Sequence, residues 1–360
     1  MNCRTYKSDE RLTNQQLAAF FCNSSLPFFQ HTDFIRFFSE FPNQLTKTTI
    51  CFDSQKVIGV CVFTVSNKRA PVRYLVTKTQ IIYGPVIAAD CDQKVVTQEI
   101  LKEIDFQIPW YNLFVQFRNR VDTSLYETVF KKQGYRFSER LNLITDISNS
   151  ELMWFNLSSS RRRQIRKSRQ NCLTINCNPE ITQIKEFYNI LRNLYNRRVH
   201  KPLPDLQFFV KFNELTIKSE IHGRIFLCMY NGSVVGGIVA PIAERDTIYE
   251  WYICGLDEEM SRHGIYPSVM ATWAAMEYGN EAGCRHFDFM GMGKPNEPYG
   301  VRDFKARFGG KWVNYGRWNK ITNIWLYALA ETAYNLLYLY KRIRNVFNGK
   351  SNLIKKDDSS

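Results

Sequence analysis

Apolar and polar positions along this 360-residue chain follow the same series of spacings twice. In the first half, helical spacing over residues 14–41 is followed by two apolar runs, 48–53 and 56–66, which a turn at Asp53 and Ser54 joins into a predicted hairpin. The remainder of this half predicts a strand over 73–87, a helix over 94–107, a strand over 111–119, a helix over 124–134 and a strand over 135–147.

The second half repeats this order. Helical spacing over 180–198 and 205–218 precedes a hairpin within 223–255, with Asn231-Gly232 at its tip. A helix over 267–283 and a strand over 284–291 follow. The repeated series indicates an internal structural duplication, although direct sequence identity between the halves is weak. We therefore expect an α/β (α+β) protein of two layered domains.

Residues 321–347 predict one long helix with an apolar stripe. Glu331 and Asn335 near its middle argue against a membrane span, because a carboxylate is costly at the centre of a bilayer. Packing on the protein is favoured. Binding at a membrane interface, aided by the basic residues at 341–344, is the alternative. Residues 348–360 are expected to be a disordered tail.

The composition is 44% hydrophobic and 14% aromatic, which excludes a disordered chain. A net charge of +14 favours anionic partners, namely phosphates, nucleic acid or an acidic membrane surface. The charge does not distinguish these partners from one another. A basic protein without such a partner is the alternative.

The ten cysteines are scattered singly. Several, such as Cys61 and Cys228, lie inside apolar strand-like runs, where a free cysteine acts as a small buried hydrophobe. The spacing shows no pairing pattern of a secreted disulfide scaffold, and the polar N-terminal residues lack an apolar signal core. A reducing cytoplasm is the expected location.

Six of the nine residues in 161–169, RRRQIRKSR, are basic. Such a segment can hold the phosphates of tRNA, of a nucleotide sugar or of an anionic lipid. The alternative is a solvated helix start after a cap at residues 158–160. The candidate tRNA- or phosphate-binding residues are Arg161, Arg162, Arg163, Arg166 and Lys167.

Two further segments offer substrate-binding side chains. Arg197 and Arg198 precede a Pro-x-Pro elbow and could bind a carboxylate or phosphate, whereas the nearby His200 is a lone histidine without a visible partner. In YEWYICG, strand alternation places Tyr249 on a different face from Tyr252. An aromatic floor of a binding site and simple core packing are the two alternatives for this segment.

The stretch 285–310 carries the strongest chemical signal. Asp288 lies between two phenylalanines. An acidic residue in such a setting is either a hydrogen-bonded core carboxylate or a residue of the functional site. A Gly- and Pro-rich loop without the G-x-x-x-x-G-K-[ST] pattern follows it. In an extended run, Lys305 and Arg307 would share one face and Phe304 and Phe308 the other, so that a cation could stabilise an oxyanion.

Several of these segments resemble the Fem family of peptidoglycan-bridge aminoacyltransferases and their GNAT-like acyltransferase relatives. The closing signature is FDFMGMG followed by YGVRDFKARFGG, and the other landmarks, in matching order, are Tyr83-Gly84-Pro85-Val86, KKQGYRF and SSSRRRQIRKSRQN. The resemblance implies two tandem GNAT-like domains, residues 1–150 and 151–320, with the helix over 321–347 packing back on the first.

Well-studied members of that family use aminoacyl-tRNA and extend the stem peptide of lipid II or of its UDP-linked precursor. By resemblance, Lys305 matches the lysine that contacts the reacting end, and Arg197 or Arg198 and Tyr252 fall near the acceptor. Two departures stand out. Arg118 and Asn119 replace an acidic residue expected after 111–117, and the acyl-CoA loop is missing.

The sequence thus predicts an acyltransferase that moves an amino acid from aminoacyl-tRNA to an amine of a peptidoglycan precursor, without metal or cofactor. Lys305 would stabilise the oxyanion, and Asp288 is a candidate proton acceptor. The substrate-binding candidates are Arg197, Arg198, Tyr249, Tyr252 and Arg307. The alternatives are an acyl-CoA-dependent N-acyltransferase of an envelope sugar or lipid, and a non-catalytic binder of nucleic acid or anionic lipid. We expect a cytoplasmic monomer that contacts the inner membrane face.

Overall fold

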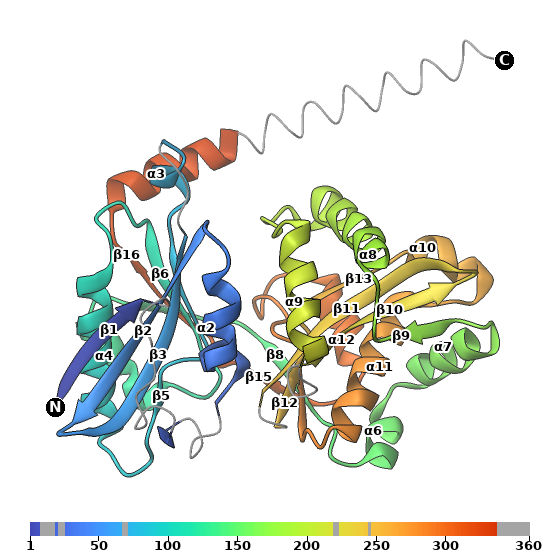
Figure 1. Cartoon of the computed structure of the whole chain (residues 1–360), viewed down its shortest axis with the longest axis horizontal. Helices are drawn as coiled ribbons and strands as arrows, with labels where there is room; N and C mark the ends of the chain where they lie inside the picture. Colours follow the sequence, from blue (N-terminus) through green and yellow to red (C-terminus); the bar gives the residue numbers. More distant parts are fainter. Residues whose placement is uncertain (8–18, 21–25, 67–70, 219–222, 244–245, 337–360) are drawn as a thin grey trace.

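Two mixed eight-stranded sheets, each covered by helices, stand side by side (Figure 1). The structure is a computed structural model, and it describes residues 1–7, 19–20, 26–66, 71–218, 223–243 and 246–336. The predicted α/β class is confirmed.

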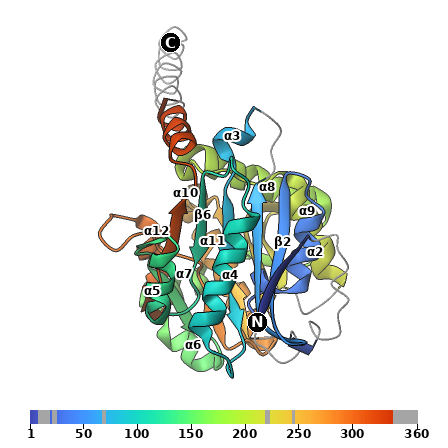
Figure 2. The ribbon, with the colours of Figure 1, turned by 90° about the vertical axis from the view of Figure 1, so that its left-hand side faces the viewer.

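The first sheet has the order β1-β2-β3-β4-β6-β16-β7, with β5 paired to β3. Its strands are β1 Asn2–Lys7, β2 Gln44–Asp53, β3 Lys56–Ser66, β4 Thr79–Ile82, β5 Val86–Ile87, β6 Phe114–Arg118, β7 Arg136–Ser138 and β16 Arg317–Ile321. The helices of this unit are η1 Phe28–Gln30, α2 Thr32–Ser39, α3 Arg73–Val76, α4 Gln93–Gln107, η2 Ser124–Tyr126 and α5 Glu127–Lys132. Apolar residues of α4 and α5 pack on β3, β6 and β16, and Figure 2 shows α4 in front of the strands.

The second sheet has the order β15-β8-β14-β12-β11-β10-β9, with β13 paired to β11. Its strands are β8 Asn142–Asp146, β9 Thr174–Asn176, β10 Gly223–Tyr230, β11 Ser233–Ala243, β12 Thr247–Tyr249, β13 Tyr252–Gly255, β14 His286–Asp288 and β15 Lys311–Val313. The helices are α6 Ser150–Asn156, α7 Ser159–Gln170, α8 Ile181–Leu194, η3 Tyr195–Val199, α9 Leu206–Lys218, α10 Asp257–Met260, η5 Ser261–His263, α11 Pro267–Glu281 and α12 Gly300–Ala306.

The duplication predicted from the repeated spacing is visible in both sheets. Each contains an antiparallel hairpin, β2–β3 or β10–β11, next to a parallel pair, β4–β6 or β12–β14. In each unit a long helix, α4 or α11, crosses between the strands of the parallel pair. The predicted turn at the second hairpin is also present, because Asn231 and Gly232 both have positive φ, as an Asn-Gly hairpin turn requires.

The two units exchange one strand each, which the sequence pattern did not predict. The segment 135–147, expected to form one strand, is split: β7 stays in the first sheet, whereas β8 pairs with β14 in the second. In return, β16 pairs with β6 in the first sheet. The domain division into 1–150 and 151–320 stays a prediction. The two sheets do not follow it at β8 and β16, because each of these strands lies in the sheet of the other unit.

Some local predictions were wrong. Residues 73–76 form α3 rather than strand, and the N-terminal residues 2–7 form an edge strand that polar composition had concealed. Of the predicted helix over 14–41, the described part contains η1 and α2, and most of residues 14–25 lie outside the described residues. The predicted helix over 321–347 begins at residue 324, after β16 has ended at Ile321, and its residues beyond 336 are not described.

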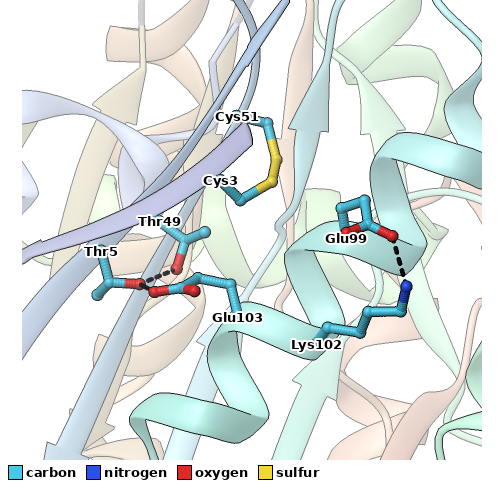
Figure 3. Close-up of a disulfide and its surroundings, with 7 residues drawn as sticks. All are labelled: Cys3, Thr5, Thr49, Cys51, Glu99, Lys102 and Glu103. Atoms are coloured by element: carbon cyan, nitrogen blue, oxygen red, sulfur yellow. Dashed lines mark hydrogen bonds and ion pairs between the residues drawn. A yellow bond between two sulfur atoms is a disulfide. The ribbon is translucent and has the colours of Figure 1, made fainter. Parts of the chain in front are cut away.

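Cys3 and Cys51 are joined by a disulfide across β1 and β2 (Figure 3), although the cysteine spacing had predicted no pairing. The two residues are direct partners in the antiparallel register, with Cα atoms 4.1 Å apart. The nearby Thr5 hydroxyl contacts Thr49 and donates to Glu103 on α4, so polar and covalent links both tie this edge strand to the sheet.

An aromatic core joins the two units. Phe28 and Phe29 of η1 and Phe37 of α2 pack against Trp251, with ring centroids 5.6–6.1 Å apart. Phe37 also meets Phe208 of α9 at 4.9 Å. Because these contacts are buried and apolar, we expect the two units to move as one body.

Candidate functional site

The carboxylate of Asp288 lies at the junction of the two units. It ends β14 and is only 4% exposed. Tyr83, from the first unit, donates from Oη to Oδ2 at 2.8 Å, while Oδ1 accepts from Asn142 Nδ2 and from the Met290 backbone N–H, each at 2.7 Å. Burial raises the pKa of Asp288, and these hydrogen bonds oppose that rise. A carboxylate with a raised pKa is a better proton acceptor than one on the surface.

Tyr83 is held in place from both units. Its backbone φ is +62°, an uncommon conformation for a residue with a side chain. Its ring packs against Phe29 of the first unit and Tyr249 of the second, with centroids 5.7 and 5.8 Å away. The next residue, Gly84, allows the buried Gln30 side chain to approach, because a Cβ there would lie 2.7 Å from it. The phenol is therefore fixed toward Asp288.

Lys305 on α12 is buried, and its ammonium is fully hydrogen-bonded. Nζ donates to the carbonyls of Phe289 and Gly291 at 2.6 and 3.0 Å, and it lies 2.8 Å from Glu250 Oε1. An ammonium has three N–H donors, so these three acceptors use all of them. Its direct role in catalysis stays a prediction, and its contacts fit a residue that positions the loop after Asp288.

Glu250, the partner of Lys305, lies where the strand of the YEWYICG segment is interrupted. Ile248 pairs with Ile242 of β11, but Tyr252 pairs with Val239, so one extra residue is accommodated between β12 and β13, as in a β-bulge. Burial raises the pKa of Glu250, and the charge and hydrogen bond of Lys305 lower it. The Glu250 side chain lies on the side of the sheet that faces α11, where the Thr272 hydroxyl contacts Oε2.

The extended run expected around Lys305 is wrong, because residues 300–306 form α12. Phe304 and Phe308 are four residues apart, which is the spacing of one helix face, and their rings are 5.4 Å apart. Lys305 consequently points inward, whereas Arg307, just past the helix end, is exposed. The two cations do not share a face, and substrate binding by Arg307 stays a prediction.

The basic segment 161–169 begins α7 after the Ser158 cap, as expected. Two of its arginines serve the fold. Arg161 is 4% exposed, donates to the Phe304 carbonyl at 3.0 Å and stacks on that ring, while Arg162 donates to carbonyls at the end of α6. Burial lowers the pKa of Arg161 to about 10. Among the five phosphate-binding candidates, the exposed ones are Arg163, Arg166 and Lys167, and their phosphate-binding role stays a prediction.

The remaining candidates lie on or near the aromatic core. Arg197 and Arg198 are exposed on η3, and Arg198 pairs with Glu258. Tyr249 is buried against Phe29, and Tyr252 packs against Phe208 and Phe209 of α9. These contacts account for both tyrosines as core residues, and their contact with substrate stays a prediction.

An acidic side chain occupies the N-terminus of α11. Asp257 Oδ1 accepts from the Ser268 backbone N–H at 3.2 Å, and Oδ2 accepts from the Ser268 hydroxyl. Gly255 permits this approach, because a Cβ there would lie 2.7 Å from both side chains. Burial raises the pKa of Asp257, and its hydrogen bonds with Ser268 oppose the rise. An anionic ligand at this helix start would therefore meet a carboxylate already in place.

Sequence reasoning missed Tyr83, Glu250 and Asn142 as members of the buried polar network. Their signals were present but weak. Tyr83 precedes a Gly-Pro pair, and Glu250 is an acidic residue in an aromatic run. No local pattern could have indicated Asn142, because it reaches Asp288 only through the exchange of β8 into the second sheet.

Comparison with known proteins supports the fold. Residues 159–305 match the acetyltransferase (GNAT) domain family. The solved structure of FemX is similar over 91% of this chain and 99% of its own, with a TM-score of 0.67 at 15% identity. The structure of L-PGS from Bacillus licheniformis is similar over 92% of this chain and 97% of its own, with a TM-score of 0.54 at 13% identity. A tandem GNAT protein from the clavulanic acid biosynthesis pathway is similar over 89% of this chain and 99% of its own, with a TM-score of 0.55 at 8% identity. No curated protein matches the sequence.

Proposed function

We propose that this chain, which has a FemX-like tandem GNAT fold, is an aminoacyltransferase that moves an amino acid from aminoacyl-tRNA to an amine of a peptidoglycan precursor. The observation that carries the proposal is the end-to-end match of both units to FemX, supported by the GNAT family match of residues 159–305. The acceptor is lipid II or a UDP-linked muropeptide, and the protein acts as a monomer on the cytoplasmic side.

The amine attacks the aminoacyl ester directly, and a tetrahedral oxyanion forms before the tRNA ribose oxygen leaves. Tyr83 accepts the amine proton as its own proton passes to Asp288 Oδ2, 2.8 Å away. The departing ribose oxygen takes a proton back from this pair, so the pair ends the cycle unchanged. Lys305 and Glu250 hold the loop that follows Asp288, and positioning supplies much of the acceleration.

The contacts of Asp257 favour this donor over acyl-CoA. A pyrophosphate commonly binds at a helix start through backbone N–H groups. At α11, Asp257 accepts the Ser268 N–H and places its own charge there. The glycine-rich loop that would supply further N–H groups is also absent from the sequence before this helix. Acyl-CoA-dependent transfer is therefore the weaker candidate.

Two exposed surfaces fit the proposed partners. Arg163, Arg166 and Lys167 present positive charge along α7 and would contact the phosphates of tRNA, where each neutralised phosphate adds to the salt dependence of binding. Arg197 and Arg198 would contact the acceptor.

The helix over 324–336 would touch the membrane that carries lipid II. Both views place it beside α3 (Figures 1 and 2), and Asn323 and Tyr74 both contact Trp110. Trp325 is 83% exposed and Trp110 70% exposed. Further exposed apolar side chains here are Val72, Leu75, Val76, Ile324 and Leu329, and we call this set the terminal apolar surface. Among the helices of the described residues, none is long and apolar enough to cross a bilayer, so the contact would be peripheral.

The test is transfer of a radiolabelled amino acid from charged tRNA to lipid II or UDP-linked muropeptide. Asp288→Asn should lower the rate about 10²–10⁴-fold, because it removes the proton acceptor. Lys102→Gln on the exposed face of α4 is the control and should leave the rate unchanged. Full activity of Asp288→Asn would refute the assignment. Transfer from acetyl-CoA instead of tRNA would identify the alternative enzyme, and salt-sensitive tRNA binding without any transfer would identify a binding protein.

A further inference from the structure

Two arginines from neighbouring strands of the first sheet lie side by side. Arg118 ends β6, and Arg317, which begins β16, is its direct partner in the antiparallel pair. Arg118 Nε and Arg317 Nη1 both donate to one atom, Gln116 Oε1, at 3.3 and 3.4 Å. Directly opposed residues share a face of the sheet, and like charges in that arrangement are destabilising.

No counter-charge from the described residues offsets the pair. Within the described ranges, no ion pair links Arg118 or Arg317 to a carboxylate, and each guanidinium gives one side-chain hydrogen bond, to Gln116. A guanidinium carries five N–H donors, so most of their donors have no acceptor among those residues. Two half-buried cations without an anion are costly, and such an arrangement suits a ligand that supplies the negative charge.

Three more cations extend this cluster. Burial and then the charges of Arg118 and Arg140 together lower the pKa of Arg317 to about 9. Lys201, from the loop between η3 and α9, has its pKa lowered by burial and then by Arg317, Arg118 and Arg140. Burial, Arg118 and Lys201 lower the pKa of Lys78 in the same way. Residues from both units thus form one region of positive charge.

The cluster adjoins the Tyr83–Asp288 pair. The Tyr83 backbone N–H donates to the Arg118 carbonyl at 2.9 Å. Burial lowers the pKa of Arg118, and electrostatic interaction with Tyr83 and with Tyr252 of β13 partly opposes this fall. The guanidinium is therefore near enough to Tyr83 and to Tyr252 of the second unit to interact with both electrostatically.

We propose that Arg118, Arg317 and Lys201 bind a phosphate or diphosphate group of a substrate next to the Tyr83–Asp288 pair. Three cations match a group with two or more negative charges better than a single carboxylate, and the guanidinium fork suits phosphate oxygens. This inference rests on the proposed function for the identity of the substrate.

Calorimetric titration with pyrophosphate tests the site without any transfer reaction. We expect the wild-type chain to bind pyrophosphate, Arg118→Gln and Arg317→Gln each to weaken binding at least tenfold, and Lys201→Gln to weaken it less. Arg36→Gln, an arginine 79% exposed on α2, makes the same charge change and should bind within twofold of wild type. Acetate should bind far more weakly. No binding of pyrophosphate, equal binding of acetate, or unchanged binding by Arg118→Gln would overturn the proposal.

Two further measurements, the melting temperature of Arg118→Gln and competition with pyrophosphate, distinguish a ligand site from a structural role and identify the source of the phosphate. A ligand site predicts that Arg118→Gln leaves the melting temperature unchanged or higher, because it relieves like-charge repulsion, whereas a clear fall would indicate a structural pair and overturn the site. Competition with pyrophosphate by UDP indicates a small acceptor, and competition by uncharged tRNA indicates the donor; competition by neither overturns a substrate site. If transfer activity is absent while pyrophosphate binds, the proposed function fails and the site stands.

Discussion

The Lys305 ammonium lies 2.8 Å from the Glu250 carboxylate, and the side chains are only 8% and 2% exposed. Two carbonyls of the loop after Asp288 complete the coordination of the ammonium. The pair therefore links α12, the bulge between β12 and β13, and the loop that positions Asp288. A lysine in this setting supports the site through its contacts.

Replacing Lys305 by Ala should destabilise the fold. The change leaves the Glu250 carboxylate buried without a partner, and breaking a buried pair in this way costs about 3–5 kcal/mol. Chemical denaturation of the variant measures the loss. The matched variant is Lys305→Met combined with Glu250→Gln, which removes both charges and should recover much of the stability. Equal stability of Lys305→Ala and wild type would contradict the pairing.

The pKa of Asp288 predicts the sign of a pH effect. Burial raises this pKa above its ordinary value of 3.8, so the folded state favours the protonated carboxyl. The contribution of protonated Asp288 to the free energy of unfolding is fully present below the ordinary pKa, and it is lost as pH rises through the raised pKa of the folded state. The free energy of unfolding of Asp288→Asn should therefore rise relative to wild type as the pH increases from about 4.

Asp90 provides a control of opposite sign. Its hydrogen bond from Lys56 lowers the pKa of this exposed carboxyl. The contribution of ionised Asp90 to stability is present above the ordinary pKa and disappears as pH falls through the lowered pKa. The free energy of unfolding of wild type should therefore increase relative to that of Asp90→Asn as pH rises. Urea denaturation across the same pH series checks both variants. Parallel trends for the two would show that the Asp288 carboxyl is not desolvated.

The Cys3–Cys51 bond makes a prediction about thiols and stability. Protein purified without reductant and then denatured should show two fewer reactive thiols than the ten cysteines of the sequence. A cross-link closing 48 residues stabilises by at most about 4 kcal/mol in the chain-entropy model, and less here because β1 and β2 already pair. Reductant should lower the melting temperature of wild type and leave Cys3→Ser unaffected. Ten reactive thiols would show that the bond does not form in solution.

The terminal apolar surface predicts binding to anionic vesicles. Trp325→Ala and Leu329→Ala should each reduce cosedimentation with phosphatidylglycerol vesicles several-fold or more, because full burial of such a side chain contributes about 1.5–3 kcal/mol. Phe155→Ala is the matched control, since Phe155 is 75% exposed on α6. Equal loss in all three variants, or no binding by wild type, would contradict a membrane-facing surface here.

The sequence determined the elements whose signals are local. The Asn231-Gly232 turn, the Ser158 cap of α7, the amphipathic α4 and the duplicated order of helix, hairpin, strand and helix all follow from neighbouring residues, because turn geometry, capping and periodicity act over a few positions. Asp288 and Lys305 could be singled out in the same way, by residue type and resemblance.

Only the tertiary structure decided what those residues contact. The exchange of β8 and β16 depends on pairing between segments far apart in the chain, and it is this exchange that brings Asn142 to Asp288 and Arg317 to Arg118. The inward direction of Lys305 likewise depends on the helix over 300–306 and on its contact with Glu250, which lies 55 positions earlier in the chain. Contacts of this kind are set by packing and strand register, which no local pattern encodes.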